Sequence, residues 1–306
     1  MTPSRSPSIL AGTLLAASLL VAVTPGRAAS LRAANPRSAT IRKVFPSAVR
    51  VQVSVKGEVV RSASGIAFAR DEGKSYILTN AHVVEPSSEW KSPAEVRVMV
   101  GGRTAPLLAR VLARGRVPDV DLALLEVADG SLSVTPLAPD SEVEVGEDLF
   151  VIGAPFGKGL SVAAGIVSEV EYDPSDAAVP PRRPRMLKTD AAIGYGSSGG
   201  GVFDIPDGRL IGLVEGYRTA RVAFGTDPDA YAFDVPMPGE TFVAPAAKIR
   251  RFLLERGLTR LAGGAGIPVT AEASRAESKG PSVGPGGANR AGAGSPVPQE
   301  GSARVP

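Results

Sequence analysis

One histidine occurs in the 306-residue chain, and it is the only imidazole available for acid–base chemistry. This residue, His82, lies in the string ThrAsnAlaHisValVal that begins at Thr79. Further along the chain, Asp121 opens an apolar run and Ser198 lies in a glycine-rich segment. An imidazole base, a carboxylate that orients it and a serine hydroxyl are the three groups of nucleophilic acyl transfer, and the order His, Asp, Ser is one of three known for serine hydrolases.

The segment around Ser198 reads GlySerSerGlyGlyGly from Gly196. Glycines allow the backbone to turn, so that the N–H groups of Gly196 and Ser198 both face the place where a tetrahedral oxyanion forms. Each feature alone has a common non-catalytic interpretation, namely a glycine turn, a packed core histidine and an aspartate that caps a strand. The combination of all three favours an acyl-transfer site.

Composition excludes several classes of function. The chain has 43% apolar and 21% charged residues, which indicates a globular protein. Its net charge is only +3, and basic and acidic residues are interspersed along the sequence, so nothing indicates a basic surface for nucleic acid. Because it has no cysteine, disulfides, thiol catalysis and cysteine-ligated metals are excluded. A single histidine argues against a catalytic zinc site, whereas calcium bound by carboxylates stays open. We expect no cofactor and no metal.

The N-terminus has the pattern of a signal peptide. Arg5 precedes an apolar stretch from Ile9 to Val23, and small residues follow to Ala29. This stretch is shorter than the roughly 20 residues of a membrane-spanning helix, which favours cleavage and export to the periplasm or the extracellular space. An uncleaved N-terminal anchor is the alternative. After cleavage we expect no membrane association.

Short runs rich in Val, Ile and Leu recur after a linker at 30–38, and Gly, Pro and Asp separate them. Strands at this spacing predict an all-β barrel or sandwich. The runs begin at Val49, Ile66, Tyr76, Val96, Leu122, Leu149, Val162 and Leu210.

One segment, 244–258, has helical spacing of Ile249, Phe252 and Leu253, which predicts a C-terminal helix. Residues 262–306 are dominated by Gly, Ala, Pro and Ser and are expected to be disordered. The proline- and arginine-rich segment from Tyr172 to Arg185 is expected to form an exposed loop.

Six ordered motifs resemble the HtrA (Deg) family of trypsin-like serine proteases, over about residues 40–260. They are SerGlyIleAlaPhe from Ser64, ThrAsnAlaHisValVal from Thr79, AspLeuAlaLeuLeu from Asp121, ValIleGlyAlaProPheGly from Val151, AlaGlyIleValSer from Ala164 and ThrAspAlaAlaIleGlyTyrGlySerSerGlyGly from Thr189.

The resemblance implies two six-stranded antiparallel β-barrels, within a protease domain at 39–261, and a catalytic cleft between them. His82 resembles the general base, Asp121 the orienting carboxylate and Ser198 the nucleophile. Asp119 is a nearby competitor, but Asp121 directly precedes the LeuAlaLeuLeu run as in the family.

The resemblance also assigns substrate-binding positions. Ala192 corresponds to the pocket for the side chain before the scissile bond, and residues Val214, Glu215 and Gly216 to its wall. A pocket without an acidic base favours small or medium apolar side chains over Lys or Arg. We therefore expect an exported endopeptidase whose partners are unfolded or damaged polypeptides.

Three departures from the family pattern keep alternatives open. Ser197 replaces the usual asparagine before the nucleophile, Gly194 and Tyr195 replace AsnPro, and Glu215 replaces a neutral residue. The altered loop leaves room for a catalytically weak or inactive, chaperone-like binding module, and a small-molecule esterase could use the same triad. We expect no PDZ domain in the tail and cannot assign an oligomeric state.

Overall fold

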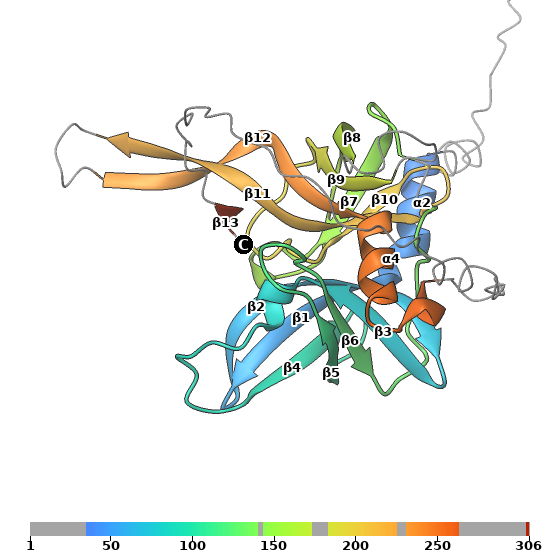
Figure 1. Ribbon diagram of the computed structural model, residues 1–306, viewed down its shortest axis with the longest axis vertical. Coiled ribbons are helices and arrows are strands. Elements are labelled where there is room, and N and C mark those ends of the chain that lie inside the picture. The colour runs from blue at the N-terminus through green and yellow to red at the C-terminus, as the bar shows by residue number, and fades with distance from the viewer. Residues whose placement is uncertain (1–34, 140–142, 173–182, 225–230, 263–303, 306) are drawn as a thin grey trace, which may run out of the picture. The chain divides into compact units, whose positions relative to one another are not determined.

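The computed structural model describes residues 35–139, 143–172, 183–224, 231–262 and 304–305 (Figure 1). The predicted signal peptide at 1–29 lies outside the described residues, as do most of the predicted tail and most of the predicted loop between Tyr172 and Arg185. Within the described ranges, no helix is both long and apolar enough to cross a membrane.

The first described element is a helix that the sequence analysis placed partly in a linker. Helix α2, Pro36–Val44, begins with a proline, whose fixed φ suits the first helical turn. Only Thr40 and Val44 are buried, so the helix has little of the apolar periodicity by which a sequence reveals such elements. A short 3-10 helix, η1 (Phe45–Ser47), leads from it into the first strand.

The first barrel closes in the order β1-β2-β3-β6-β5-β4, and all its pairings are antiparallel. Alternate residues point inward, so valines of β1 and β4 share one core. The short helix α3 interrupts the chain between β3 and β4. The elements are β1 Ala48–Val55, β2 Glu58–Asp71, β3 Lys74–Thr79, α3 Ala81–Val84, β4 Ala94–Val100, β5 Leu107–Arg114 and β6 Ala123–Val127.

The second barrel has the order β10-β7-β8-β9-β12-β11, and an additional pairing of β10 with β11 closes it. Its two longest strands, β11 and β12, pair along their lengths and extend past the barrel as a ribbon (Figure 1). The elements are β7 Asp148–Gly153, η2 Pro155–Gly157, β8 Ser161–Tyr172, β9 Pro184–Thr189, β10 Gly201–Asp204, β11 Leu210–Phe224 and β12 Tyr231–Pro245.

A third hydrophobic cluster joins the two barrels. Ile66 and Leu78 of the first barrel lie in it with Phe150 and Phe203 of the second, whose rings stack at 5.3 Å between centroids. The C-terminal helix α4, Ala246–Leu254, buries Ile249, Phe252 and Leu253 in the same cluster. The turn η4 (Thr259–Leu261) adds Leu261 to it. The barrels are therefore packed together through this shared cluster, in addition to the core inside each barrel.

The predicted fold, two six-stranded antiparallel barrels with a C-terminal helix, is confirmed. Two details differ from the local predictions. The loop expected from Tyr172 to Arg185 is shorter, because Tyr172 ends β8 and Pro184 begins β9. Within the tail, Arg304–Val305 form a strand, β13, that pairs with β11.

Replacement of Phe252 tests the shared cluster. The Phe252→Ala change removes a fully buried ring and should lower the free energy of unfolding by about 3–5 kcal/mol in urea denaturation. Leu254, which is 62% exposed on the same helix, is the control, and Leu254→Ala should change stability by less than about 0.5 kcal/mol. Equal effects of the two changes would contradict the packing described here.

Candidate active site

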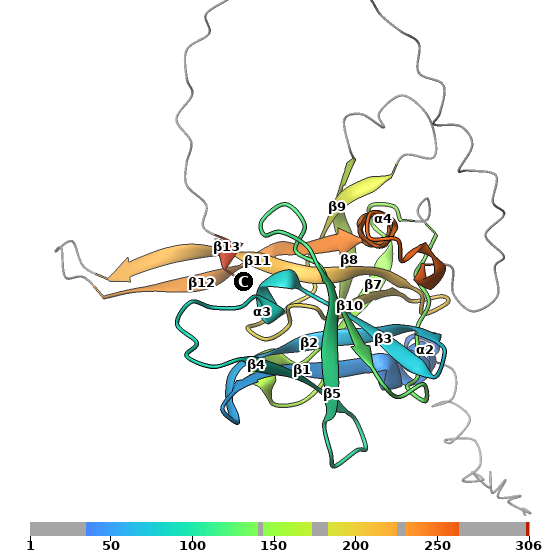
Figure 2. The same cartoon turned by 60° about the horizontal axis from the view of Figure 1, so that its bottom comes forward.

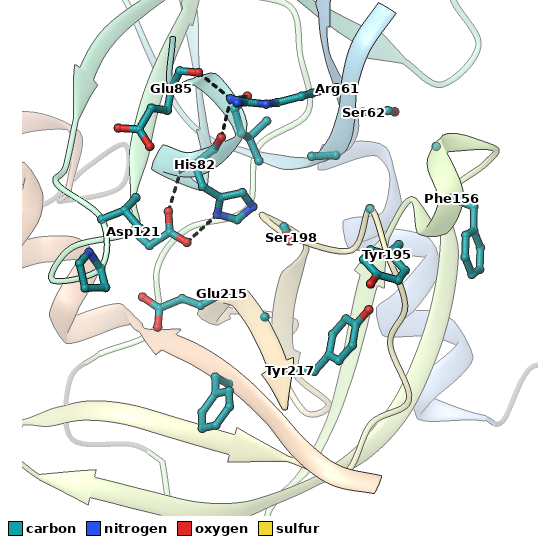
Figure 3. Close-up of a pocket in the computed structure, with 18 residues that line it drawn as sticks. Arg61, Ser62, His82, Glu85, Asp121, Phe156, Tyr195, Ser198, Glu215 and Tyr217 are labelled. Atoms are coloured by element: carbon teal, nitrogen blue, oxygen red, sulfur yellow. Dashed lines mark hydrogen bonds and ion pairs between the residues drawn. The ribbon is translucent and has the colours of Figure 1, made fainter. Parts of the chain in front are cut away.

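His82 lies on the one-turn helix α3, directly after strand β3. The guanidinium of Arg61 on β2 holds the end of this helix, because one Nη donates to the carbonyls of His82 (2.8 Å) and Glu85 (2.5 Å). The Trp90 ring covers the same guanidinium at 4.7 Å. A cation suits the carbonyl end of a helix, so Arg61 fixes the backbone that carries His82 (Figure 3).

The carboxylate of Asp121 holds His82 at two points. One oxygen accepts the backbone N–H of His82 at 3.0 Å, and the other contacts the ring Nδ1 at 2.7 Å. Because a carboxylate only accepts hydrogen bonds, this contact selects the tautomer of the neutral imidazole that carries its proton on Nδ1 and its lone pair on Nε2. The amide of Asn80 also donates to the Asp121 carbonyl at 2.8 Å, which fixes the start of the β6 segment beside α3.

The competing carboxylate, Asp119, makes no such contact. It lines a neighbouring cavity of about 320 Å³ together with Lys248 and Phe252. The structure thus brings Asp121, and not Asp119, to the imidazole.

Ser198 precedes β10 in the second barrel and faces the His82 ring across the cleft (Figure 3). Its side chain is largely buried, with 8% of the residue exposed. Among the hydrogen bonds of the described residues, none joins the Ser198 hydroxyl to the imidazole. Catalytic hydrogen bonds are often long in the absence of substrate, so the arrangement is compatible with proton transfer once a substrate is bound.

Ser64 of β2 holds the loop that carries Ser198. Its N–H donates to the Ser198 carbonyl at 2.9 Å, and its hydroxyl donates to the Gly196 carbonyl at 2.7 Å. The same hydroxyl accepts the N–H of Ala154 at 2.8 Å. One serine of the first barrel therefore fixes two parts of the second.

The loop needs glycine next to Ser198. Gly199 has a φ of 77°, and a Cβ there would overlap the Ser64 carbonyl and the Thr79 side chain. Ser197 closes the turn before it, because its N–H donates to the Gly194 carbonyl at 3.0 Å and its hydroxyl accepts the Gly194 N–H at 3.3 Å. The serine that replaces the family's asparagine thus has a local structural partner.

The carbonyls of this loop are engaged away from the cleft. The Tyr195 carbonyl accepts the N–H of Phe156 at 2.5 Å, and the Ser197 carbonyl accepts that of Gly200 at 2.8 Å. In a trans peptide the next N–H points the opposite way, so the amides of Gly196 and Ser198 face away from these partners. Within the described structure neither amide donates a hydrogen bond, which leaves both available to a ligand.

A cavity of about 810 Å³ is lined by His82, Asp121, Gly196 and Ser198 (Figure 3). Glu215 and Gly216, two of the predicted wall residues, line it together with Phe156, Tyr195 and Tyr217. The third predicted wall residue, Val214, does not line the cavity, because it is fully buried in the core of the second barrel. Its backbone instead bonds Gly199 (3.0 Å) and Gly200 (2.9 Å), so it anchors the nucleophile loop.

Ala192 lies in a second, mostly apolar cavity of about 500 Å³. Phe156, Tyr195 and Tyr217 line both cavities and therefore form the wall between them. The two tyrosine rings meet edge to face at 5.9 Å. Burial, and then the neighbouring Tyr195, raises the pKa of Tyr217 to about 12, so its phenol stays neutral. Tyr195 is 49% exposed, so about half of its surface is not packed against other residues.

Glu215 does not face solvent, although its side chain is on the cavity wall. Its carboxylate, 9% exposed, pairs with Lys248 of α4 at 2.6 Å. The ion pair links the wall to the helix that joins the barrels and balances the negative charge.

Sequence reasoning missed Arg61, Phe156, Tyr217 and Lys248. The sequence offered one indication for Arg61, namely that it is a charged residue inside an apolar strand. Nothing in the sequence related Lys248 to Glu215. Within the described residues, no group of three or more His, Asp or Glu side chains could hold a metal ion.

Comparisons with known proteins bear on the domain as a whole. A family model, the trypsin-like peptidase domain, matches residues 63–213. The probable periplasmic serine endoprotease DegP-like of Ectopseudomonas mendocina (strain ymp) is 37% identical over 49% of this chain and 28% of its own length. The mitochondrial serine protease HTRA2 of Drosophila virilis is 31% identical over 56% of this chain and 39% of its own length.

A crystal structure of the serine endoprotease from Yersinia pestis shares the fold, with a TM-score of 0.53 and 24% identity, over 73% of this chain and 66% of that one. Two barrels around a His–Asp–Ser cleft define a trypsin-like serine protease domain. The relatives narrow the similarity further, because the proteins that this chain resembles are serine proteases of the HtrA and DegP-like kind. It spans well under half the length of the curated relatives described above.

The two carboxylates can be separated by mutation. Asp121→Asn keeps the shape of the side chain but no longer fixes the Nδ1–H tautomer, and kcat for peptide hydrolysis should fall by roughly 10⁴-fold. Asp119→Asn is the matched control and should keep kcat within about twofold of the unmutated protein. A larger loss from Asp119→Asn than from Asp121→Asn would show that the wrong carboxylate has been assigned.

Proposed function

We propose that this protein is a serine endopeptidase that cleaves unfolded or damaged polypeptides through an acyl-enzyme on Ser198. The observation that carries the proposal is the double contact of Asp121 with His82, which leaves Nε2 free on the side of Ser198. We assign His82 as general base, Asp121 as its orienting carboxylate, and the amides of Gly196 and Ser198 as the oxyanion hole.

In the first half of the reaction, the Ser198 oxygen bonds to the scissile carbonyl carbon while His82 Nε2 takes the hydroxyl proton. The amides of Gly196 and Ser198 stabilise the resulting oxyanion. The tetrahedral intermediate collapses when the C–N bond breaks, and the imidazolium donates its proton to the leaving amine. Water then attacks the acyl-enzyme with the same base, which releases the new carboxylate and regenerates Ser198.

A strand edge beside the cavity favours a polypeptide over a small ester. On one flank β11 pairs with β12, and on the other it pairs with β10 only from Leu210 to Leu213. Beyond Val214, on the flank that β10 leaves open, an extended peptide can add to the sheet through main-chain hydrogen bonds. Gly216 lines the cavity without a side chain that would obstruct such a strand. A small ester has no peptide backbone that could form hydrogen bonds with this edge.

Substrate preference follows from the tyrosine wall. An apolar side chain before the scissile bond reaches Ala192 only if Tyr195 moves, because Tyr195 and Tyr217 separate the two cavities. With Tyr195 in place, we expect small residues such as Ala or Val at this position. The N-terminal apolar stretch supports export, to the periplasm or outside the cell.

Active-site labelling tests the function directly. A fluorophosphonate probe should label the unmutated protein, which should also cleave unfolded casein. The Ser198→Ala and His82→Ala variants should lose both, since members of a triad act as a unit. The exposed Ser88→Ala variant is the control and should retain both. No labelling and no cleavage in the unmutated protein would favour the inactive binding module, and cleavage of small esters alone would favour an esterase.

Tyr195→Ala tests the wall. Removal of this half-exposed ring joins the two cavities, and kcat/KM for substrates with Leu before the scissile bond should rise about tenfold relative to those with Ala. Tyr217→Phe keeps the ring and should leave the preference unchanged. An unaltered profile in Tyr195→Ala would remove Ala192 from the specificity pocket.

A further inference from the structure

The open flank of β11 already has an occupant within the described chain. Strand β13, Arg304–Val305, pairs antiparallel with β11, Val305 opposite Tyr217 and Arg304 opposite Arg218. Both ribbon views show β13 beside β11 at the edge of the second barrel (Figures 1 and 2). A segment from the end of the sequence therefore lies next to the catalytic cavity, because Tyr217 lines that cavity.

The pairing of β11 with β12 is irregular next to this edge. The register shifts at two places, and the residues skipped there, Glu215 and Arg218, have no partner in β12. Such bulges are common beside active sites, where they redirect a strand. Arg218 instead has its register partner in β13.

The direction of β13 is also informative. Since the pair is antiparallel, the chain runs from Arg218 toward Tyr217 as it passes from Arg304 to Val305. The next residues of β11 in that direction, Gly216 and Glu215, line the catalytic cavity. The segment thus approaches the cavity along the edge on which the proposed function places the substrate backbone.

We propose that the segment Arg304–Val305 is an intramolecular competitor of substrate, which occupies the docking edge of β11 and must leave before a polypeptide binds. This inference rests on the proposed protease function. Because the segment is part of the same chain, its pairing does not depend on protein concentration. Competition of this kind lowers the competent fraction of the enzyme and raises the apparent KM, while kcat at saturating substrate stays the same.

The connection is long enough for this arrangement. Residues 263–303 separate Ala262, after the turn η4, from β13. At about 3.4 Å per residue, this length of chain can span up to roughly 140 Å, several times the diameter of a small domain.

Backbone pairing can be removed without a change in chain length. The double variant Arg304→Pro/Val305→Pro lacks both N–H donors and cannot maintain a strand ladder. If the segment occupies the edge about 90% of the time, kcat/KM for an unfolded polypeptide should rise about tenfold, through KM alone. The matched control, Ala291→Pro/Gly292→Pro, places two prolines in the tail outside β13 and should leave KM unchanged.

Hydrogen exchange gives a second measurement that does not need activity. Exchange at Tyr217 and Arg218, the two residues that pair with β13, should be faster in the Arg304→Pro/Val305→Pro variant than in the unmutated protein or the control. Thermal melting of the Arg304→Pro/Val305→Pro variant should fall by only a few degrees, since β13 lies outside both barrels and its loss removes one contact of the folded state.

The outcomes separate the two proposals. Fluorophosphonate labelling with unchanged KM and unchanged exchange in the Arg304→Pro/Val305→Pro variant would overturn the competitor and leave the protease function intact. A fall in kcat in that variant would also overturn it, because a competitor affects KM. If no form of the protein is labelled, the protease function fails, and with it the competitor.

Discussion

The proposed active site depends on a contact between the barrels that Ser64 makes. The proposed base and its carboxylate belong to the first barrel, whereas the proposed nucleophile belongs to the second. The alignment of these three side chains therefore depends on how firmly the two barrels are held together. Ser64 joins the carbonyls of Gly196 and Ser198 and the amide of Ala154 to strand β2, and Thr79 in turn donates to the Ser64 carbonyl at 2.8 Å. These bonds are buried or partly buried, where main-chain groups need partners and water competes little.

The local sequence predicted the fold best where one face of a strand is buried. Alternation in β1 and β4 follows the valines of a closed barrel, and the spacing of Ile249, Phe252 and Leu253 follows the buried face of α4. Strand β5 was not identified, because only Ala109 of its eight residues is buried and no apolar period results. Strand β12 contains Pro236, Pro238 and Gly239, residues that usually indicate turns; its register with β11 skips residues 237–240, and Gly239 has a φ of 77°, so β12 is one strand only because both flanks of this irregularity pair with β11.

The site was predictable in its chemistry and less so in its surroundings. A unique histidine and an aspartate that precedes a buried strand are visible in one sequence, and the structure brings His82 and Asp121 together. The wall of Tyr195 and Tyr217 was not visible, because Tyr195 lies in the loop between β9 and β10 and Tyr217 on β11, and the distance between these segments depends on barrel closure. The same reason applies to Lys248, which meets Glu215 only because α4 packs across the junction.

The uniqueness of His82 makes the proposed catalytic centre observable by spectroscopy. In a protein with several histidines, imidazole signals must be assigned before any can be interpreted. Here every imidazole resonance in an NMR spectrum comes from the ring that contacts Asp121. The protonation, tautomer and mobility of this ring can therefore be followed with isotope-labelled histidine alone, while substrate, inhibitor or the chain's own β13 occupies the neighbouring strand edge. His82 can thus serve as a spectroscopic probe of the proposed catalytic centre.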